Sequence, residues 1–168
     1  MPIFGKKSMN KLVTCHQDIQ TVMHEAIKIY DFSVIQGRRS LETQFIYFKK
    51  GRKLVSKNHD PELASSWIIE DKEKVITNID GYIHKGMHNY DISRACDIAP
   101  YPIDWSGSLK ARARFYFLSG IIFGVSDRLY EKEKIKHLLR WGGDWDQDGI
   151  RVDKDPDESF FDGGHVEI

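Results

Sequence analysis

The sequence has few cysteines, no long apolar run and no excess of charge of either sign. Cys15 and Cys96 are its only two cysteines in 168 residues, too few for a disulfide scaffold, and both fit a reducing compartment as buried small side chains. The most apolar run, residues 115–125, is far shorter than the roughly 20 residues that span a bilayer. These shortages argue against a disulfide-rich secreted scaffold and predict no membrane insertion.

The absence of net charge argues against strongly charged binding partners. Lys plus Arg and Asp plus Glu both number 25, so no global field would attract nucleic acid or an anionic membrane, and we expect neither as a partner. Charged residues make up 30% and hydrophobic residues 40% of the chain, as in ordinary globular proteins. The length predicts a single domain over residues 1–168, and we expect a monomer.

Charge is less even along the chain than in total. Residues 144–168 contain nine acidic and only two basic residues. Such a concentration of carboxylates favours a bound cation, or else it forms a solvated face. Residues 1–7 contain no apolar stretch of the kind found in secretory signals, so we expect synthesis in a cytoplasm without a signal peptide.

Hydrophobic periodicity and capping residues predict a mixture of helices and strands. Residues 51–86 are the least readable part and are typical of either an insertion or a loop that lines the substrate, and the role of residues 55–86 is left open. The predicted helices cover residues 10–30, 41–49 after an N-cap at Ser40, and 109–130 after an N-cap at Ser108; the predicted strands cover residues 32–35, 94–99, 135–141 and 165–168, with residues 75–80 as a further candidate.

The stretch from His88 to Trp105 carries the first candidate chemistry. His88 and Asp97 are separated by eight residues, and Asp97 lies in an apolar alternation typical of a strand. The alternation puts Ala95 and Ala99 on the face of Asp97, which leaves room for an ion. Cys96 is on the opposite face, so we predict it to be neither a ligand nor a nucleophile.

A second stretch at the C-terminus, Asp162-Gly-Gly-His165-Val-Glu167, complements the first. His88, Asp97 and His165 are the three ligand types that zinc takes in catalytic sites, where a fourth position stays open. Glu167 shares a strand face with His165 and could orient it as a second carboxylate, or it is a surface charge.

A zinc peptidase also needs a proton carrier and a cation near the developing oxyanion. Asp162, three residues before His165, is the candidate base, and Arg39 is the best candidate cation. The residues alone leave open whether Arg38 and Arg39 point into a cleft or are ordinary surface charges. Surface or structural roles are predicted for His16 and His24, because neither was found to have a second ligand nearby. His59 and His84 are possible ligands by residue type, but loop roles are predicted for both.

A calcium loop is a further hypothesis. Asp144, Asp146 and Asp148 followed by Gly149 match the start of the calcium-loop pattern, but Asp155 stands where that pattern has a bidentate glutamate. The alternative is a polar turn that borders the cleft.

Three stretches of the chain resemble one known family. Ile35-Gln-Gly-Arg-Arg-Ser-Leu-Glu-Thr-Gln44 is similar to that family's Gly-Tyr-Arg-Ser…Gln segment, and His88 to Trp105 resembles the form His-Asn-x-x-x-Ser-x-Ala-x-Asp-Ile-x-Pro-Tyr-Pro-Ile-Asp-Trp. Arg140-Trp-Gly-Gly-Asp-Trp-Asp146, together with Asp162-x-x-His165-x-Glu167, resembles its closing block. The family is that of the zinc D-alanyl-D-alanine carboxypeptidases and L-alanyl-D-glutamate endopeptidases, in the short form encoded by bacteriophages.

The resemblance implies a role for each candidate residue. It implies zinc ligation by His88, Asp97 and His165, catalysis by Asp162 as general base and acid, and assistance by Arg39 rather than Arg38. It also implies an α+β fold with an antiparallel sheet and packed helices, of the kind shared by Hedgehog domains and these peptidases. The spacing from His88 to Asp97 is two residues longer than usual in the family, so a longer loop must be accommodated.

These expectations combine into a predicted function. We expect a zinc-dependent hydrolase of the peptidoglycan stem peptide, a phage endolysin that preferentially cuts the L-alanyl-D-glutamate bond and degrades the cell wall. The alternatives are a D-alanyl-D-alanine carboxypeptidase of the same fold and a non-catalytic wall-binding or virion structural domain. Without a signal, the protein would reach the wall or periplasm after release through a membrane lesion, or be carried in the virion.

Overall fold

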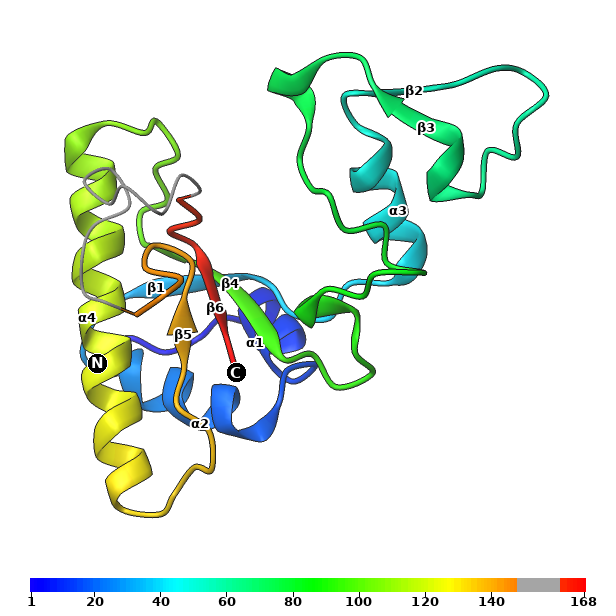
Figure 1. The fold of residues 1–168 in the computed structure, drawn as a ribbon. Helices are drawn as coiled ribbons and strands as arrows, with labels where there is room; N and C mark the ends of the chain where they lie inside the picture. The colour runs from blue at the N-terminus through cyan, green and yellow to red at the C-terminus, as the bar shows by residue number, and fades with distance from the viewer. Residues whose placement is uncertain (148–160) are drawn as a thin grey trace. The chain divides into compact units, whose positions relative to one another are not determined.

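The computed structural model describes residues 1–147 and 161–168, which form two compact units (Figure 1). The first unit contains Met1–Arg38 and Ile92–Ile168, and the second contains Arg39–Asp91. The second unit is therefore inserted between two segments that build the first. A single peptidase domain over the whole chain stays a prediction.

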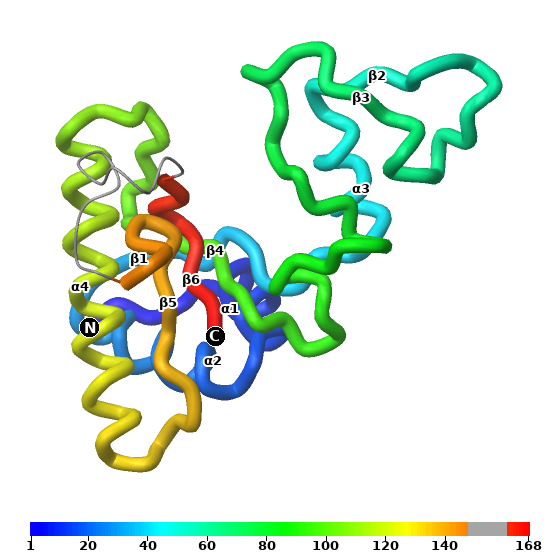
Figure 2. The backbone as a smooth tube through the Cα atoms, viewed as in Figure 1, coloured from blue at the N-terminus to red at the C-terminus, as the bar shows by residue number. Residues whose placement is uncertain are grey.

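A four-stranded antiparallel sheet, in the order β1-β4-β6-β5, forms the centre of the first unit. Strands β4 and β6 are adjacent although they lie far apart in the sequence, as the backbone trace shows (Figure 2). The strands are β1 (Phe32–Gln36), β4 (Ala95–Pro100), β5 (Arg140–Trp141) and β6 (His165–Glu167).

Three helices pack with this sheet: α1 (Lys6–Leu12), α2 (Gln17–Ala26) and α4 (Leu109–Glu131). Helix α1 contacts β1, and α4 contacts both α2 and β4 (Figure 1). The apolar side chains of these elements form one core, in which Ile19, Ile98, Ile122 and Val166 are almost fully buried. Both free cysteines lie in this core, as predicted from their small apolar character.

The second unit is built on helix α3 (Leu41–Lys49) and a two-stranded antiparallel sheet, β2 (Arg52–Leu54) with β3 (Trp67–Ile69). Phe45 and Phe48 stack on the buried face of α3. The remaining short elements are 3-10 turns: η1 (Ala64–Ser66), η2 (Lys72–Lys74) and η3 (Met87–Asn89).

The predicted α+β class with an antiparallel sheet and packed helices is confirmed. The predicted N-caps are also confirmed, because Ser40 Oγ accepts from the amide of Thr43 and Ser108 Oγ accepts from that of Ala111, each at 3.2 Å. Strands β1, β4 and β6 and helix α4 lie within two residues of their predicted bounds.

The predicted single helix over residues 10–30 is wrong, because the chain breaks between α1 and α2. Thr14 Oγ1 donates to the carbonyl oxygen of Lys11 and accepts from the amide of Arg38, which competes with helical bonding. His16 then becomes the N-cap of α2, and its Nδ1 accepts from the amide of Asp18 at 3.2 Å. A side-chain N-cap starts a new helix at this point.

Two strand predictions also differ from the structure. Of residues 135–141, only Arg140 and Trp141 form a strand, because the amides of residues 136 and 137 donate to the carboxylate of Asp18 instead of to a neighbouring strand. Residues 75–80 form no strand in the described chain, since the side chains of Arg52 and Gln44 occupy the carbonyl oxygens of residues 77 and 79.

Gly120 and Gly124 on α4 do not mark places where another backbone segment comes close. A Cβ added at either glycine meets none of the described atoms within 4 Å beyond its own turn of helix. Helix α4 therefore packs through its larger apolar side chains, such as Leu118 and Ile122.

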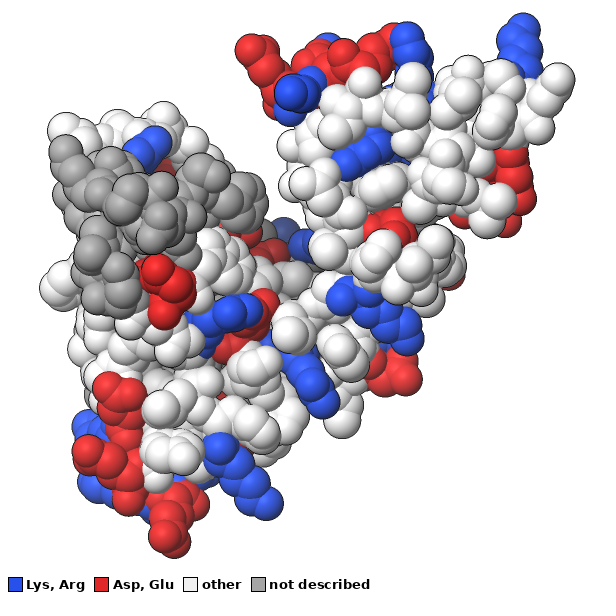
Figure 3. Space-filling model, viewed as in Figure 1, with Lys and Arg blue, Asp and Glu red and all other residues white. Residues whose placement is uncertain are grey.

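The visible face of each unit carries Lys and Arg side chains interspersed with Asp and Glu (Figure 3). This mixing on the face shown agrees with the balanced composition, which provides no field of one sign. Within the described part of the chain, no helix is both long and apolar enough to cross a bilayer.

Candidate active site

Strands β4 and β6 bring Asp97 and His165 together in the first unit. The antiparallel register places the two residues directly opposite each other, and His165 Nδ1 lies 3.1 Å from Asp97 Oδ1. His165 is buried and Asp97 is partly buried, so the pair is largely removed from solvent but Asp97 is still accessible to it. The two residues come from sequence stretches that were predicted to act together.

Glu167 holds the second ring nitrogen of His165. Its Oε2 lies 2.9 Å from His165 Nε2, while its other oxygen is bound by Arg140, whose Nε donates at 3.1 Å. The Glu167 carboxylate is buried, which excludes the alternative that this residue is only a surface charge. With a proton on Nε2 donated to Glu167, Nδ1 could present its lone pair beside Asp97 once a metal replaced its proton, the arrangement that carboxylates impose on metal-ligating histidines.

Burial and hydrogen bonding act in opposite directions on these groups. Burial lowers the pKa of His165, but hydrogen bonds with Asp97 and Glu167 outweigh it and raise the pKa to about 9. Burial raises the pKa of Glu167, but hydrogen bonds from His165 and Arg140 outweigh it and lower that pKa. The site therefore holds a strongly negative environment around one imidazole, which suits a cation.

Asp162 lies in the turn that leads into β6. Its amide donates to the carbonyl oxygen of Gly142 at 2.6 Å, and its own carbonyl accepts from the amide of His165 at 3.0 Å. A Cβ at Gly142 would lie 2.6 Å from the carbonyl oxygen of Asp162, so the close approach of these two segments requires glycine there. The negative charge of Asp162 contributes to the raised pKa of His165.

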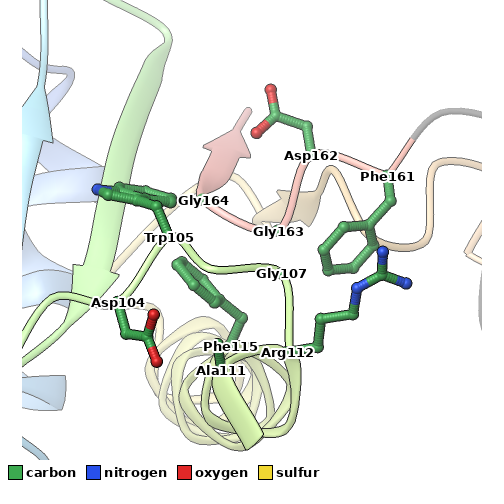
Figure 4. A pocket seen from close by; sticks show the side chains of 10 residues that line it. All are labelled: Asp104, Trp105, Gly107, Ala111, Arg112, Phe115, Phe161, Asp162, Gly163 and Gly164. Carbon is green, nitrogen blue, oxygen red and sulfur yellow. The ribbon is translucent and has the colours of Figure 1, made fainter. Parts of the chain in front are cut away.

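A cavity of about 220 Å³ lies beside Asp162 in the first unit (Figure 4). Aromatic rings form much of its wall, with the Trp105 and Phe115 ring centres 5.2 Å apart, and the Arg112 guanidinium lies 5.8 Å from the Phe161 ring centre. The Asp162 carboxylate points away from the Phe115 ring. The described lining consists of Asp104, Trp105, Gly107, Ala111, Arg112, Phe115, Phe161, Asp162, Gly163 and Gly164.

Arg39 and His88 are brought together in the second unit. The Arg39 amide donates to the carbonyl oxygen of His88 at 2.8 Å, and the Asn89 side-chain amide donates to the carbonyl oxygen of Arg39 at 3.2 Å. His88 is buried in the short 3-10 turn η3. Arg39 is partly buried whereas Arg38 is exposed, which agrees with the choice between the two arginines made from the family resemblance.

Gln44 is a residue of this region whose role the sequence reasoning missed. It is almost fully buried on α3, and its Oε1 accepts from Arg39 Nη1 at 2.9 Å. Its amide nitrogen donates to the carbonyl oxygen of Ile79 at 2.8 Å, so both ends of the side chain are used. The Arg39 guanidinium also lies 5.0 Å from the Tyr47 ring centre. The sequence did contain a signal for this role, because Gln44 is the last residue of the stretch that resembles the family segment.

Two predictions about the remaining residues have different outcomes. Cys96 lies fully buried in the core, as expected of a residue that is neither ligand nor nucleophile. The calcium hypothesis stays a prediction: Asp144 is partly buried and Asp146 exposed, while Asp148, Gly149 and Asp155 lie outside the described residues.

The surroundings of one histidine differ from what its sequence neighbourhood suggested. His16 does have potential ligands nearby, because Asp18 and His137 lie beside it in the first unit. His137 is 121 positions further along the sequence, so local spacing gave no signal for this group. His24 belongs to no such group among the described residues, in agreement with its predicted surface role.

Comparison with known proteins identifies the family. A family model described as phage L-alanyl-D-glutamate peptidase matches residues 2–168. The chain belongs to this family. A search of curated proteins finds no match. Among solved structures, the L-Ala D-Glu endopeptidase ChiX of Serratia marcescens shares the fold, with a TM-score of 0.54, 17% identity, and coverage of 98% of this chain and 88% of that chain.

Family membership confirms the predicted class of enzyme, a phage peptidase acting on the peptidoglycan stem peptide. The structural similarity to the Serratia enzyme independently confirms the fold. Groups of histidine and aspartate that could hold a metal ion are present in the described chain, consistent with a metallopeptidase.

Proposed function

We propose that the protein is a zinc-dependent endopeptidase that hydrolyses the L-alanyl-D-glutamate bond of the peptidoglycan stem peptide. The main support for zinc is a chain of side-chain contacts in which Asp97 touches His165, His165 touches Glu167, and Glu167 touches Arg140. A carboxylate ligand, an imidazole ligand and a second carboxylate behind the imidazole form the donor set typical of catalytic zinc. As a lysin, the protein would reach the wall after release from the host or within the phage particle.

His88 would be the third zinc ligand, as the resemblance of residues 88–105 to the family's motif implies. Within the second unit His88 is buried, and its carbonyl oxygen accepts from the amide of Arg39, the residue proposed to stabilise the oxyanion. The two candidate residues of this unit are therefore held next to each other.

Zinc, if held by these residues, would supply Lewis-acid chemistry to the scissile carbonyl. Asp162 is fixed by backbone hydrogen bonds to Gly142 and His165, and it would take the proton of the attacking water and return it to the leaving amine. Arg39, oriented by Gln44, stabilises negative charge that develops on the carbonyl oxygen.

The cavity beside Asp162 is the proposed binding place for part of the stem peptide. Its aromatic wall accepts apolar side chains, and Arg112 adds a positive charge at its edge. A D-glutamate residue keeps one free carboxylate when its other carboxyl group is in an amide bond, so it can use this charge. A D-alanyl-D-alanine end also has a free carboxylate, so the preference for the L-alanyl-D-glutamate bond rests on the family match and not on this charge.

Two variants separate metal binding from proton transfer. His88→Ala is expected to lose the active-site zinc and wall lysis together, whereas Asp162→Asn should keep that zinc and lose about 10²–10⁴-fold in rate. His24→Ala, at an exposed histidine of α2, is the control and should change neither quantity. Unchanged lysis by Asp162→Asn would remove its role as proton carrier, and full zinc content in His88→Ala would remove His88 as a ligand.

A further inference from the structure

A cluster of His16, Asp18 and His137 in the first unit lies outside the proposed active site. Each residue offers one potential ligand atom, and these atoms lie within 4.8 Å of one another. His16 is the N-cap of α2, Asp18 is in its first turn, and His137 lies in the connection between α4 and β5. The cluster therefore joins two segments that are remote in sequence.

We propose that His16, Asp18 and His137 form a second metal site, which takes a divalent ion such as Zn²⁺, Ni²⁺ or Co²⁺. Two imidazoles and one carboxylate are a donor set that these metals accept. Ligand atoms around one tetrahedral zinc lie ~3.3–3.5 Å apart, given metal–ligand distances of ~2.0–2.2 Å. The side chains therefore need to move by only about an ångström to close around an ion.

The Asp18 carboxylate is already positioned for this task. Its Oδ2 accepts from the backbone amides of Lys136 and His137 at 2.9 and 3.0 Å, and lies 2.7 Å from His137 Nδ1. The same oxygen lies 3.9 Å from His16 Nδ1, a separation at which no hydrogen bond forms; that nitrogen accepts from the Asp18 amide, a bond that an ion at Nδ1 would replace. Burial raises the pKa of Asp18, but its hydrogen bonds with His137 and with these amides outweigh that effect and lower the pKa.

The surroundings allow an ion to enter and limit its affinity. The side chains of His16 and His137 are 33% and 51% exposed, so water can complete the coordination. A cavity of about 140 Å³ beside them is lined by His16, Arg94, His137 and Ile168. The positive charge of Arg94 opposes a cation, so this site should bind more weakly than the active site.

A bound ion would fasten the α4–β5 connection to the start of α2. That connection leads directly into β5, which pairs with β6, the strand that carries His165. The second site would therefore stabilise the strands of the active site without contacting substrate.

Calorimetric titration of metal-free protein with Zn²⁺ alone tests this inference. His137→Gln keeps a donor for Asp18 but removes a good metal ligand, so it should fold normally and bind one ion fewer than the wild type. His16→Ala should show the same loss, while His24→Ala, an exposed histidine of the same helix, should match the wild type.

The difference of one ion does not depend on the active site, because all variants retain its residues. Zn²⁺ should also raise the midpoint of thermal unfolding more in the wild type than in His137→Gln, and peptidoglycan cleavage should persist in that variant. Equal numbers of bound ions in the wild type and in folded His137→Gln would overturn the inference and leave an ordinary hydrogen-bonded cluster.

Discussion

At the scale of single residues, His165 is defined by what touches its two ring nitrogens. One nitrogen faces the candidate ligand Asp97 and the other faces Glu167, itself held by Arg140. The sequence placed His165 and Glu167 on one strand face, which is correct because β6 is a strand. It could not predict the ion pair with Arg140, which depends on the pairing of β5 with β6.

Replacing Glu167 by glutamine tests this arrangement. The amide would hold the imidazole less firmly and lower its basicity, so zinc affinity should fall by about 10–100-fold while the fold is retained. Competition with a chromophoric chelator measures the change. Glu25→Gln, at an exposed helical carboxylate that pairs with Lys28, is the matched control. Equal zinc affinity in Glu167→Gln and the wild type would show that Glu167 does not tune the ligand.

Asp80 is a second buried carboxylate with a defined task. Its Oδ1 accepts from the amides of Tyr82 and Ile83 at 2.7 and 2.6 Å, and its Oδ2 lies 3.0 Å from His84 Nδ1. Burial raises the pKa of Asp80, but the hydrogen bonds from Ile83, His84 and Tyr82 outweigh it and leave the pKa lowered. The carboxylate therefore stabilises the turn over residues 80–84 in its ionised form.

This lowered pKa sets the direction of a pH effect. A group whose pKa is lowered by folding stabilises the native state above its unfolded pKa of about 4, and loses that contribution as the pH falls through the lower folded value. Asp80→Asn should cost about 1–3 kcal/mol at neutral pH and weaken the acid dependence of unfolding. Denaturant titrations at pH 7 and pH 3 measure both effects, with the exposed turn residue Asp60 changed to Asn as control. A variant that keeps the wild-type acid dependence would contradict this role.

At the scale of elements, the sequence predicted those whose signals are local. Ser40 and Ser108 mark helix starts, and alternation marks β4, because these signals act within a few residues. The break between α1 and α2 and the shortness of β5 could not be predicted in this way. Both depend on contacts with distant partners, the amide of Arg38 for Thr14 and the carboxylate of Asp18 for residues 136 and 137.

Glycine substitutions test how closely the elements pack. Gly142→Ala places a Cβ 2.6 Å from the carbonyl oxygen of Asp162, so it should destabilise the protein by about 1–3 kcal/mol and displace the turn that carries Asp162. Gly120→Ala, with open space around its Cβ on α4, should instead stabilise by about 0.5–1 kcal/mol. Denaturant unfolding of both variants measures the difference. Equal stabilities would refute the close approach at Gly142.

At the scale of the whole molecule, the candidate residues are divided between the two units. The first unit holds Asp97 and His165 on its two central strands and Asp162 in the turn before β6, and the second holds Arg39 next to His88. The types of the candidate residues and their order along the chain were predictable, because most of these residues lie in short continuous motifs of the sequence. The division of the chain into two units was not, since it depends on which segments pack together.

The central claim is zinc-dependent cleavage of the L-alanyl-D-glutamate bond. The most direct test is mass spectrometry of purified peptidoglycan after incubation with the protein, with a chelator, and with zinc restored. We predict fragments cut between L-alanine and D-glutamate that disappear with the chelator and return with zinc. Loss of only terminal D-alanine would identify a carboxypeptidase, and the absence of cleavage by folded, zinc-loaded protein would contradict the account.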